Sequence, residues 1–522
     1  MKPAILKDHI LFSTPDPRTL QAYFPDVRSA VVGGEQVFAV PLSLDSARLL
    51  RNLGIEAPSP IRDLKHYDWP IRPDWSIGWW QQDTAEFFTL NKRGHCHNAM
   101  RTRKTFSTLW AVDYLQRIGE IHKALVVAPI SSLELAWADT LFYNFPRKRY
   151  AVLHAAAQKR RDLLAQNHDI YIINHDGVEI ILPELMKRKD IDCIVVDEVH
   201  EYFNTRTKKW KALNQFINMR GVDSWVWGLT GTPTPEGRPT DAYGQMKLIK
   251  PEAYKGHFTS FKNETMQQFG MFKWVPRRGS EDIVHKVLSP SIRFTRAVVT
   301  DMTPTIIERH AELSKQQAYH LNELLKQSVT EINGSVVTAV NAAVLLQKII
   351  QASSGVLYGA GGEFCEMDFG PRLAVLKELI AGNQEKCVVF VPFTGALEAV
   401  ARELKKDWSV AIVHGDTSAG QRNQTFRDFQ SKKDPWIIVA HPQCMSYSLN
   451  LCAASLLIHY APPNSGKIFQ QANARIDGDN QRVKQDIALI SATPTERIMY
   501  AALQGKERFQ DVVTDLLQAG RK

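Results

Sequence analysis

The chain has few cysteines and no long apolar run, and these shortages exclude several classes of protein. Its 522 residues include six cysteines, none in a C-x-x-C pair, which is typical of a reducing compartment with buried or idle thiols. His95-Cys96-His97 has no second ligand pair near it in the sequence, so we expect no metal there. No apolar stretch approaches the ~18 residues of a membrane helix, and the N-terminus lacks a signal-peptide layout. We therefore expect a soluble, cytoplasmic protein without a membrane partner.

The composition is that of a globular protein with a modest basic excess. Hydrophobic residues make up 44% and charged residues 23% of the chain, which excludes a disordered or fibrous protein. The 64 Lys and Arg residues exceed the 55 Asp and Glu residues by nine. This excess suits a polyanionic partner such as nucleic acid, although a basic surface without such a partner explains it equally well.

The length of the chain predicts two or three domains, because one ordinary core does not grow this large. Two short strands around Gly33-Gly34 and a helix that stops at Gly54 indicate a small leading α+β unit. Two segments that alternate apolar runs with helices then flank a segment richer in helices. The predicted N-terminal unit, first α/β domain, helical insertion and second α/β domain are residues 1–75, 76–255, 256–370 and 371–522.

Eight short apolar runs predict the buried strands of the two α/β domains. They are residues 124–129, 169–174, 192–198, 224–232, 386–393, 409–416, 435–442 and 454–462. Nearly continuous hydrophobic runs that end in small or polar residues are typical of parallel sheets covered on both faces. The predicted fold class is therefore α/β, with two parallel sheets in tandem. Ligands of such sheets bind at the carboxyl ends of the strands.

Residues 97–106, with the sequence HNAMRTRKTF, raise the main question. They contain Lys104-Thr105, as a phosphate-binding loop does, and they lead into a helical stretch whose N-terminal end would favour phosphate. Asp197 and Glu198 follow four apolar residues at the end of a predicted strand, so they are poorly explained as solvated loop acids. One such carboxylate can hold Mg²⁺, and the other can orient or deprotonate an attacking water.

Taken together, these motifs resemble those of superfamily-two helicases, and more closely the Swi/Snf-type translocases and their compact phage-encoded members. WWQQDTAEFF resembles the adenine-recognising Q-motif, DEVH the Walker B box, GLTGTP motif III and QQANARIDGDNQ motif VI. VVAPISSLELAW, YIINHDGV, VVFVPF and MSYSLNLCAASLLIHY resemble further helicase motifs in the expected order. The similarity covers residues 60–515, and it rests on the order of the motifs because each one alone is weak.

The resemblance implies two RecA-like domains, ATP and Mg²⁺ as cofactors, and DNA, duplex or branched rather than RNA, as the partner. It also implies replication or recombination proteins as partners, and a bacterial host cell if the gene belongs to a phage. The implied nucleotide contacts are Gln81 or Gln82, Arg101, Thr102, Arg103, Lys104, Thr105 and Phe106, with Thr105 and Asp197 on the metal. The implied catalytic residues are Asp197, Glu198, Gln471 and Arg475. The implied nucleic-acid contacts are Ser131, His175, Thr230, Thr232, Thr394 and Ser446. Residues such as Ser131, His175, Thr394 and Ser446 are more often ordinary polar loop residues.

The chain departs from the family pattern within the implied ATP site. Glycines are usual at Arg101 and Arg103, where the backbone needs φ > 0. An arginine adopts that conformation at a cost of about 1 kcal/mol. Glycine is also usual at Ser448 and at Asn480, and Gly478 stands where motif VI has its second arginine. An arginine finger changes the rate by about 10³–10⁵ in systems where it has been removed or supplied.

Two hypotheses follow. The chain is a DNA-dependent ATPase that couples hydrolysis to movement on or remodelling of DNA, with Arg103 or Arg101 supplying the charge missing at Gly478. Alternatively, it is a helicase-like DNA-binding protein whose degenerate ATP site hydrolyses poorly, with nucleotide binding and slow hydrolysis as a middle case. The basic stretch 274–296 is predicted to clamp duplex DNA, or else to be a solvated linker.

Overall fold

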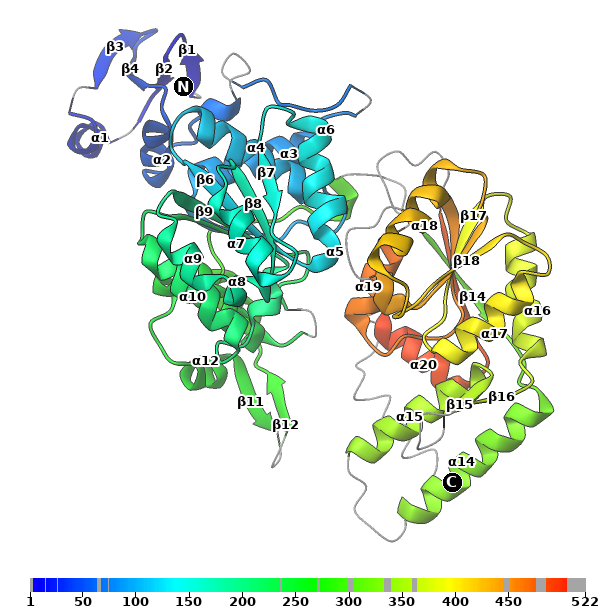
Figure 1. The fold of residues 1–522 in the computed structure, drawn as a ribbon. Helices are drawn as coiled ribbons and strands as arrows, with labels where there is room; N and C mark the ends of the chain where they lie inside the picture. The colour runs from blue at the N-terminus through cyan, green and yellow to red at the C-terminus, as the bar shows by residue number, and fades with distance from the viewer. Residues whose placement is uncertain are drawn as a thin grey trace. The chain divides into compact units, whose positions relative to one another are not determined.

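The chain, as a computed structural model, divides into two compact units, Met1–Val299 and Thr300–Lys522. Each unit contains one parallel sheet, so the predicted tandem of two parallel-sheet domains is confirmed (Figure 1). None of the helices in the described part of the chain has the length and apolar character needed to cross a membrane. The structure describes residues 3–14, 16–25, 27–62, 67–73, 75–234, 237–269, 273–298, 304–332, 339–358, 364–445, 451–475 and 485–504.

The N-terminal segment folds as an antiparallel sheet with two helices. The β3–β4 turn contains Gly33 and Gly34 with φ of 61° and 86°, so the predicted hairpin is confirmed. Phe12 and Phe38 belong to the same hydrophobic cluster as the first parallel sheet, against which this segment therefore packs. The elements are β1 (Ala4–Leu6), β2 (His9–Phe12), α1 (Pro17–Tyr23), β3 (Arg28–Val32), β4 (Glu35–Pro41) and α2 (Leu44–Asn52).

The first parallel sheet has the strand order β13-β5-β10-β9-β6-β8-β7. Alternate residues of β6 enter two different hydrophobic clusters: Val126 packs with the cluster that contains α4, and Val127 packs with the cluster that contains α10. Both faces are thus covered, which explains why these strands are continuously apolar. The strands are β5 (Arg93–Cys96), β6 (Lys123–Ala128), β7 (Tyr150–Val152), β8 (Ile170–Asn174), β9 (Ile191–Asp197), β10 (Trp225–Leu229) and β13 (Ser291–Ile292).

Helices surround this sheet, and a two-stranded hairpin of β11 (Met266–Phe269) and β12 (Lys273–Pro276) extends from the same unit (Figure 1). The helices that precede β9 are α3 (Trp79–Leu90), α4 (Lys104–Arg117), α5 (Ile130–Ser132), α6 (Asp139–Asn144), α7 (Ala157–Ala165), α8 (Gly177–Ile180) and α9 (Leu182–Lys187). Those that follow it are α10 (Lys208–Arg220), α11 (Ala242–Ile249), α12 (Phe258–Thr265) and α13 (Ser280–Val287).

The second parallel sheet has the strand order β14-β21-β20-β17-β19-β18. Its strands are β14 (Thr305–His310), β17 (Lys386–Phe390), β18 (Val410–Val413), β19 (Ile437–Ala440), β20 (Ala454–His459) and β21 (Asp486–Ser491). The remaining elements of this unit are α14 (Lys315–Ile332), α15 (Ala339–Ser353), β15 (Val356–Tyr358), β16 (Phe364–Glu366), α16 (Gly370–Ala381), α17 (Thr394–Leu404), α18 (Ala419–Ser431), α19 (Gly466–Asn473) and α20 (Pro494–Leu503).

All eight predicted strands are present, but β5, β7, β13, β14 and β21 were not predicted. Strand β5 has the sequence RGHC and β14 has TIIERH, and neither is a continuous apolar run. Strand β13 pairs with β5 in the first sheet, and β14 pairs with β21 in the second. The segment 256–370, predicted as one helical insertion, is therefore divided between the two units.

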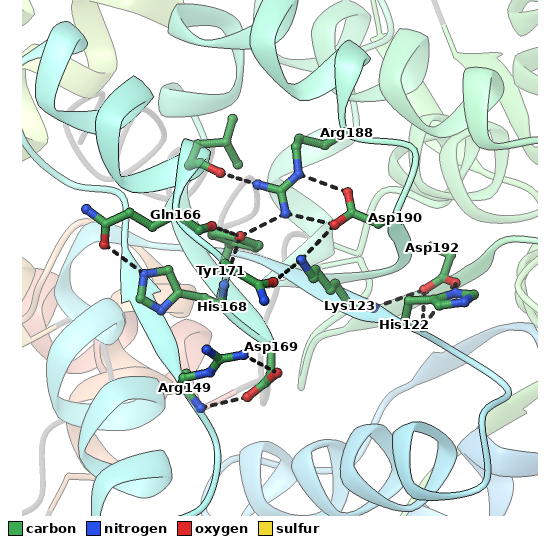
Figure 2. A network of polar contacts seen from close by, with 12 residues as sticks. His122, Lys123, Arg149, Gln166, His168, Asp169, Tyr171, Arg188, Asp190 and Asp192 are labelled. Atoms are coloured by element: carbon green, nitrogen blue, oxygen red, sulfur yellow. Dashed lines mark hydrogen bonds and ion pairs between the residues drawn. The ribbon is translucent and has the colours of Figure 1, made fainter.

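Ion pairs connect the amino ends of β6 and β9 in the first sheet (Figure 2). Arg188 donates twice to the Asp190 carboxylate, at 2.9 Å each, and Lys123 lies 2.7 Å from the same group. The Arg188 hydrogen bonds hold the pKa of Asp190 well below its usual range. Because Lys123 begins β6 and Asp190 directly precedes β9, this network fixes the end of the sheet opposite to the carboxyl ends.

Candidate nucleotide site

The predicted phosphate loop connects β5 to α4. Helix α4 begins at Lys104, and its N-cap residue Arg103 has φ of 57° and ψ of 45°. Arg101 is also left-handed, with φ of 65°. This conformation costs an L-residue about 1–2 kcal/mol, so it persists only where the surrounding structure enforces it. Both arginines therefore have the backbone conformation that glycine adopts easily, as expected for the family motif.

The Lys104 side chain lies along this loop. Its ammonium donates to the carbonyls of Asn98 at 2.9 Å and Ala99 at 3.2 Å. The buried Thr102 hydroxyl donates to the same Ala99 carbonyl at 2.9 Å, and the Asn98 amide donates to Thr84 Oγ1 of α3 at 2.8 Å. The loop thus combines an ammonium with the N–H groups at the start of α4, which together favour phosphate binding.

The Arg103 guanidinium, by contrast, lies on an aromatic ring. It is centred 4.3 Å from the ring centroid of Trp75, and it donates to the carbonyl of Ser76 at 3.4 Å. The Trp75 ring also contacts Phe106 of α4, with 5.1 Å between centroids. Phe106 is only 3% exposed, so this predicted nucleotide contact belongs to the hydrophobic core.

The two glutamines of the predicted adenine-binding segment have different surroundings. Gln81 is 1% exposed, and its Oε1 accepts from the main-chain N–H of Gly78 at 2.8 Å. Its Nε2 has no hydrogen-bond partner among the described residues. Gln82 Oε1 is 3.5 Å from Arg62. Because a buried amide donor ordinarily has a partner, Gln81 is the better candidate for a missing ligand contact.

Asp197 lies at the carboxyl end of β9, beside the phosphate loop. Strands β9, β10 and β5 are parallel neighbours, with Asp197 opposite Leu229 and Leu229 opposite Cys96. The indole of Trp137 donates to Asp197 Oδ2 at 3.0 Å. Burial and the Glu198 carboxylate raise the pKa of Asp197 to about 6, while the charge of Lys104 opposes this shift. The carboxylate and the loop that contains the lysine therefore lie at the same edge of the sheet.

Glu198 and the following motif form one polar network at the same edge. Glu198 is left-handed, with φ of 51°, and its Oε2 lies 3.1 Å from His200 Nδ1. His200 Nδ1 is also 2.9 Å from Thr230 Oγ1, which accepts from the Thr232 N–H at 3.1 Å. Thr230 is fully buried, so an effect of this predicted contact on nucleic acid would be indirect. The arrangement joins the ends of β9 and β10.

The donor set suits Mg²⁺ held jointly by protein and phosphate. The described residues contain no group of three or more His, Cys, Asp or Glu side chains that could hold a metal. Mg²⁺ usually takes only one or two carboxylates and completes its shell with water and phosphate oxygens. Asp197 and the Thr105 hydroxyl, both half-buried, are the residues present for that role.

The predicted nucleic-acid contacts that the structure describes differ in their exposure to solvent. Ser131 is half-buried, and its Oγ has no partner among them. His175 is only 8% exposed, with Nδ1 3.1 Å from the Tyr202 hydroxyl. Thr394 is exposed at the start of α17. Ser446, Ser448, Gly478 and Asn480 lie outside the described residues.

Gln471 and Arg475 of the second unit lie one helical turn apart, on α19 and just after it, with 2% and 5% of their surfaces exposed.

Sequence reasoning missed four partners of the predicted residues, Trp75, Asn98, Trp137 and His200. His200 lies in DEVH and Trp137 in VVAPISSLELAW, so both could have been predicted as site residues from these motifs. Trp75 lies outside every motif.

Comparison with known proteins agrees with this geometry. The SNF2-related domain model matches residues 96–354, and the helicase conserved C-terminal domain model matches residues 371–477. An uncharacterized ATP-dependent helicase of Mycoplasma pneumoniae is 22% identical over 414 residues, which cover 77% of this chain and 38% of that protein. Protein p41 of the Acyrthosiphon pisum secondary endosymbiont phage 1 is 25% identical over 410 residues, which cover 75% and 86% of the two chains.

The chain therefore spans well under half the length of the Mycoplasma relative. Among solved structures, the Sulfolobus solfataricus SWI2/SNF2 ATPase core in complex with dsDNA has 18% identity and a TM-score of 0.39, and the match covers 86% of this chain and 96% of that one. The two family models together match most of the chain, in the order that the motifs predicted. The domain order agrees with the geometry, in which the phosphate loop, Asp197, Glu198 and Thr230 lie at the carboxyl ends of strands in one sheet. The chain belongs to the Swi/Snf-like branch of the superfamily-two helicases.

Proposed function

We propose that this chain is a DNA-dependent ATPase of the helicase or translocase type, which couples ATP hydrolysis to movement on or remodelling of DNA. The observation that carries the proposal is the glycine-like backbone of the phosphate loop, with Lys104 inside it and Asp197 close by. Residues held in left-handed conformations cluster at ligand-binding sites, so the retained backbone of this loop supports phosphate binding in spite of the arginine side chains.

The candidate site residues of the first unit have separate roles in this proposal. Lys104 and the first N–H groups of α4 bind the phosphates, and Thr105 and Asp197 hold Mg²⁺. When bound, Mg²⁺ neutralises charge that develops on the phosphate oxygens. Glu198 orients the attacking water and accepts its proton, and the His200 contact at 3.1 Å fixes the position of the carboxylate. Gln471 and Arg475 of motif VI act on the same reaction, as the family resemblance implies.

DNA contact is supported by basic and aromatic residues in and around the β11–β12 hairpin, whose second strand overlaps the start of the segment 274–296. The Lys262 ammonium lies 3.6 Å from the ring centroid of Trp274. Phe269 is 67% exposed, and Arg277 and Arg278 are exposed beyond β12. Lysine and arginine provide contacts to phosphate, and aromatic rings provide stacking surfaces for bases.

The test is an ATPase assay with and without single-stranded DNA, duplex DNA and RNA. Lys104→Ala and Asp197→Asn are expected to abolish turnover. Asp192→Asn is the matched control, because Asp192 lies in the same strand as Asp197 but near its opposite end, where it contacts His122. DNA stimulation of the wild type supports the proposal.

A wild-type rate equal to that of Lys104→Ala and Asp197→Asn would instead support the degenerate-site alternative. The observation that favours this alternative is the presence of Arg101 and Arg103 at glycine positions. In that case the chain binds DNA without efficient hydrolysis. An active wild type that is stimulated by RNA alone would instead contradict DNA as the partner.

A further inference from the structure

The first half of the phosphate loop is paired with the segment through which the chain leaves the first unit. Strand β13 is a parallel neighbour of β5, with Ser291 opposite His95. The pairing continues past the ends of both strands, since the Ala99 N–H donates to the Phe294 carbonyl at 2.8 Å. The first unit ends at Val299, shortly after Phe294. The last segment of this unit therefore holds the loop.

Asn98 joins this segment to α3. Its Oδ1 accepts from the Phe294 N–H at 2.9 Å, and its Nδ2 donates to Thr84 Oγ1 at 2.8 Å. The Thr84 hydroxyl donates to the Trp80 carbonyl at 2.7 Å, which leaves its oxygen to accept from Asn98. Asn98 and Thr84 are 1% and 0% exposed, so water does not readily replace either of the Asn98 hydrogen bonds. The amide therefore fixes the distance between the loop, α3 and Phe294.

The same part of the loop provides the oxygens that hold Lys104. The Lys104 ammonium donates to the carbonyls of Asn98 at 2.9 Å and Ala99 at 3.2 Å. The Asn98 carbonyl and the Ala99 N–H belong to one planar peptide group. Because that N–H donates to Phe294, the segment that leaves the unit also fixes the direction in which the carbonyl faces the ammonium.

The cost of losing the Asn98 side chain follows from its two contacts. The Phe294 N–H and the Thr84 oxygen would each lose a buried hydrogen-bond partner. Such a loss corresponds to about 5- to 150-fold in an equilibrium constant. A site that is ordered in only a fraction of the molecules binds its ligand more weakly by that fraction. Nucleotide affinity should therefore fall when the amide is removed.

We propose that Asn98 is a positioning residue for nucleotide binding, and that it couples the phosphate loop to the segment through which the chain leaves the first unit. Phosphates bound at Lys104 then stabilise the pairing of the loop with Phe294. By linkage, this pairing strengthens phosphate binding to the same extent. The inference rests on the proposed function, because it requires nucleotide binding at the loop.

The test begins with calorimetric titration of the full-length protein with a non-hydrolysable ATP analogue and Mg²⁺. Asn98→Leu keeps a similar volume and removes both hydrogen bonds, so it is expected to weaken binding by about 5-fold or more. Thr84→Val removes only the acceptor of the Asn98 amide and should also bind more weakly than the wild type. Thr84→Ser keeps the hydroxyl and should restore the wild-type affinity.

Asn144→Leu is the matched control. Asn144 is also a buried asparagine of the first unit, and it makes the same two kinds of contact. Its Oδ1 accepts from the Arg72 N–H at 2.9 Å, and its Nδ2 donates to the Thr140 carbonyl at 2.9 Å. Asn144→Leu should lower Tm about as much as Asn98→Leu does, but it should leave nucleotide affinity unchanged.

Amide hydrogen exchange separates positioning from a purely structural role. In the wild type, the analogue at about 100 times its Kd should slow exchange of the Ala99 and Phe294 amides by up to about 100-fold, because binding stabilises the paired state. In Asn98→Leu, at the same multiple of its own Kd, the effect at Phe294 should be lost, because its N–H no longer has a partner in the loop.

Two results would overturn the inference and leave the proposed function intact. One is wild-type affinity in Asn98→Leu and Thr84→Val, or an equal loss of affinity in Asn144→Leu. The other is exchange at Phe294 that does not respond to the analogue in the wild type. Absence of nucleotide binding by the wild type would overturn the proposed function together with the inference. If a thermal melt shows that Asn98→Leu does not fold, the comparison of Thr84→Val with Thr84→Ser decides.

Discussion

Replacing Glu496 in the second unit should destabilise the protein more than replacing any surface acid. Glu496 of α20 lies 2.7 Å from Arg372 of α16, and both side chains are fully buried. Its other oxygen accepts from the main-chain N–H groups of Ala492 at 2.7 Å and Thr493 at 3.1 Å. Glu496→Ala would leave the Arg372 guanidinium buried without a counter-charge and would remove the capping box of α20.

The expected loss follows from these contacts. Removing one partner of a buried ion pair costs about 3–5 kcal/mol, and losing an N-terminal cap adds about 1 kcal/mol. The expected total is therefore about 4–6 kcal/mol, which in a unit of this size lowers Tm by about 10–20 °C. Replacing both partners together, as Arg372→Met with Glu496→Leu, should restore most of the stability, because no charge remains buried.

The assay is differential scanning calorimetry of the full chain. Glu403→Ala is the matched control, because Glu403 also lies 2.7 Å from a cation, Lys406, but at the surface of the same unit. Water screens such a pair, so its loss should barely move the transition. Equal shifts for Glu496→Ala and Glu403→Ala, or a Glu496→Ala loss below about 1 kcal/mol, would refute the reasoning from burial.

Three further predictions concern the proposed site and its supports. The pKa of Asp197 is raised to about 6, so Mg²⁺-dependent nucleotide affinity should fall as the pH drops through that value. Without metal, the free energy of unfolding should decline as the pH rises from about 4 to 6, because the folded state holds the proton more tightly than the unfolded state. Calorimetry that finds an affinity independent of pH would contradict the metal role. Arg278→Ala should weaken DNA binding and reduce the slope of log affinity against log salt by about 1, and an unchanged slope in a binding titration would exclude a phosphate contact at that residue. Asp190→Asn should lower Tm at neutral pH, and the difference from the wild type should shrink below about pH 4. The reason is that the carboxylate, whose pKa is depressed, stabilises the fold only while it is ionised. A Tm difference that does not change with pH would argue against this linkage.

The parallel sheets could be predicted because their central strands are buried on both faces. A run such as residues 192–198 must then be apolar throughout, and that pattern is visible without any knowledge of the neighbours. Strands β5 and β14 could not be recognised in this way. Strand β5 contains Gly94 and Arg93, and most of β14 is exposed, so only their partners in the sheet give them extended structure.

The sequence motifs proposed the members of the candidate site, but they did not predict the contacts of these residues. Lys104 and Asp197 were expected to meet because the carboxyl ends of parallel strands share one edge. Burial of Thr230 and Phe106 was not expected, since loop and helix-start residues were assumed to face the ligand. Their burial depends on packing against distant segments, which a short motif does not contain.

The sequence by itself determined the order of the motifs, the two parallel sheets, and the presence of Arg101 and Arg103 beside Lys104. These features depend on local composition and periodicity, and they follow from residues that are neighbours in the chain. Only the tertiary structure decided that both arginines keep left-handed backbones and that Arg103 lies on Trp75, 28 positions earlier in the chain. The physical reason is that a side-chain rotamer is chosen by contacts worth about 1 kcal/mol with residues brought near by the fold.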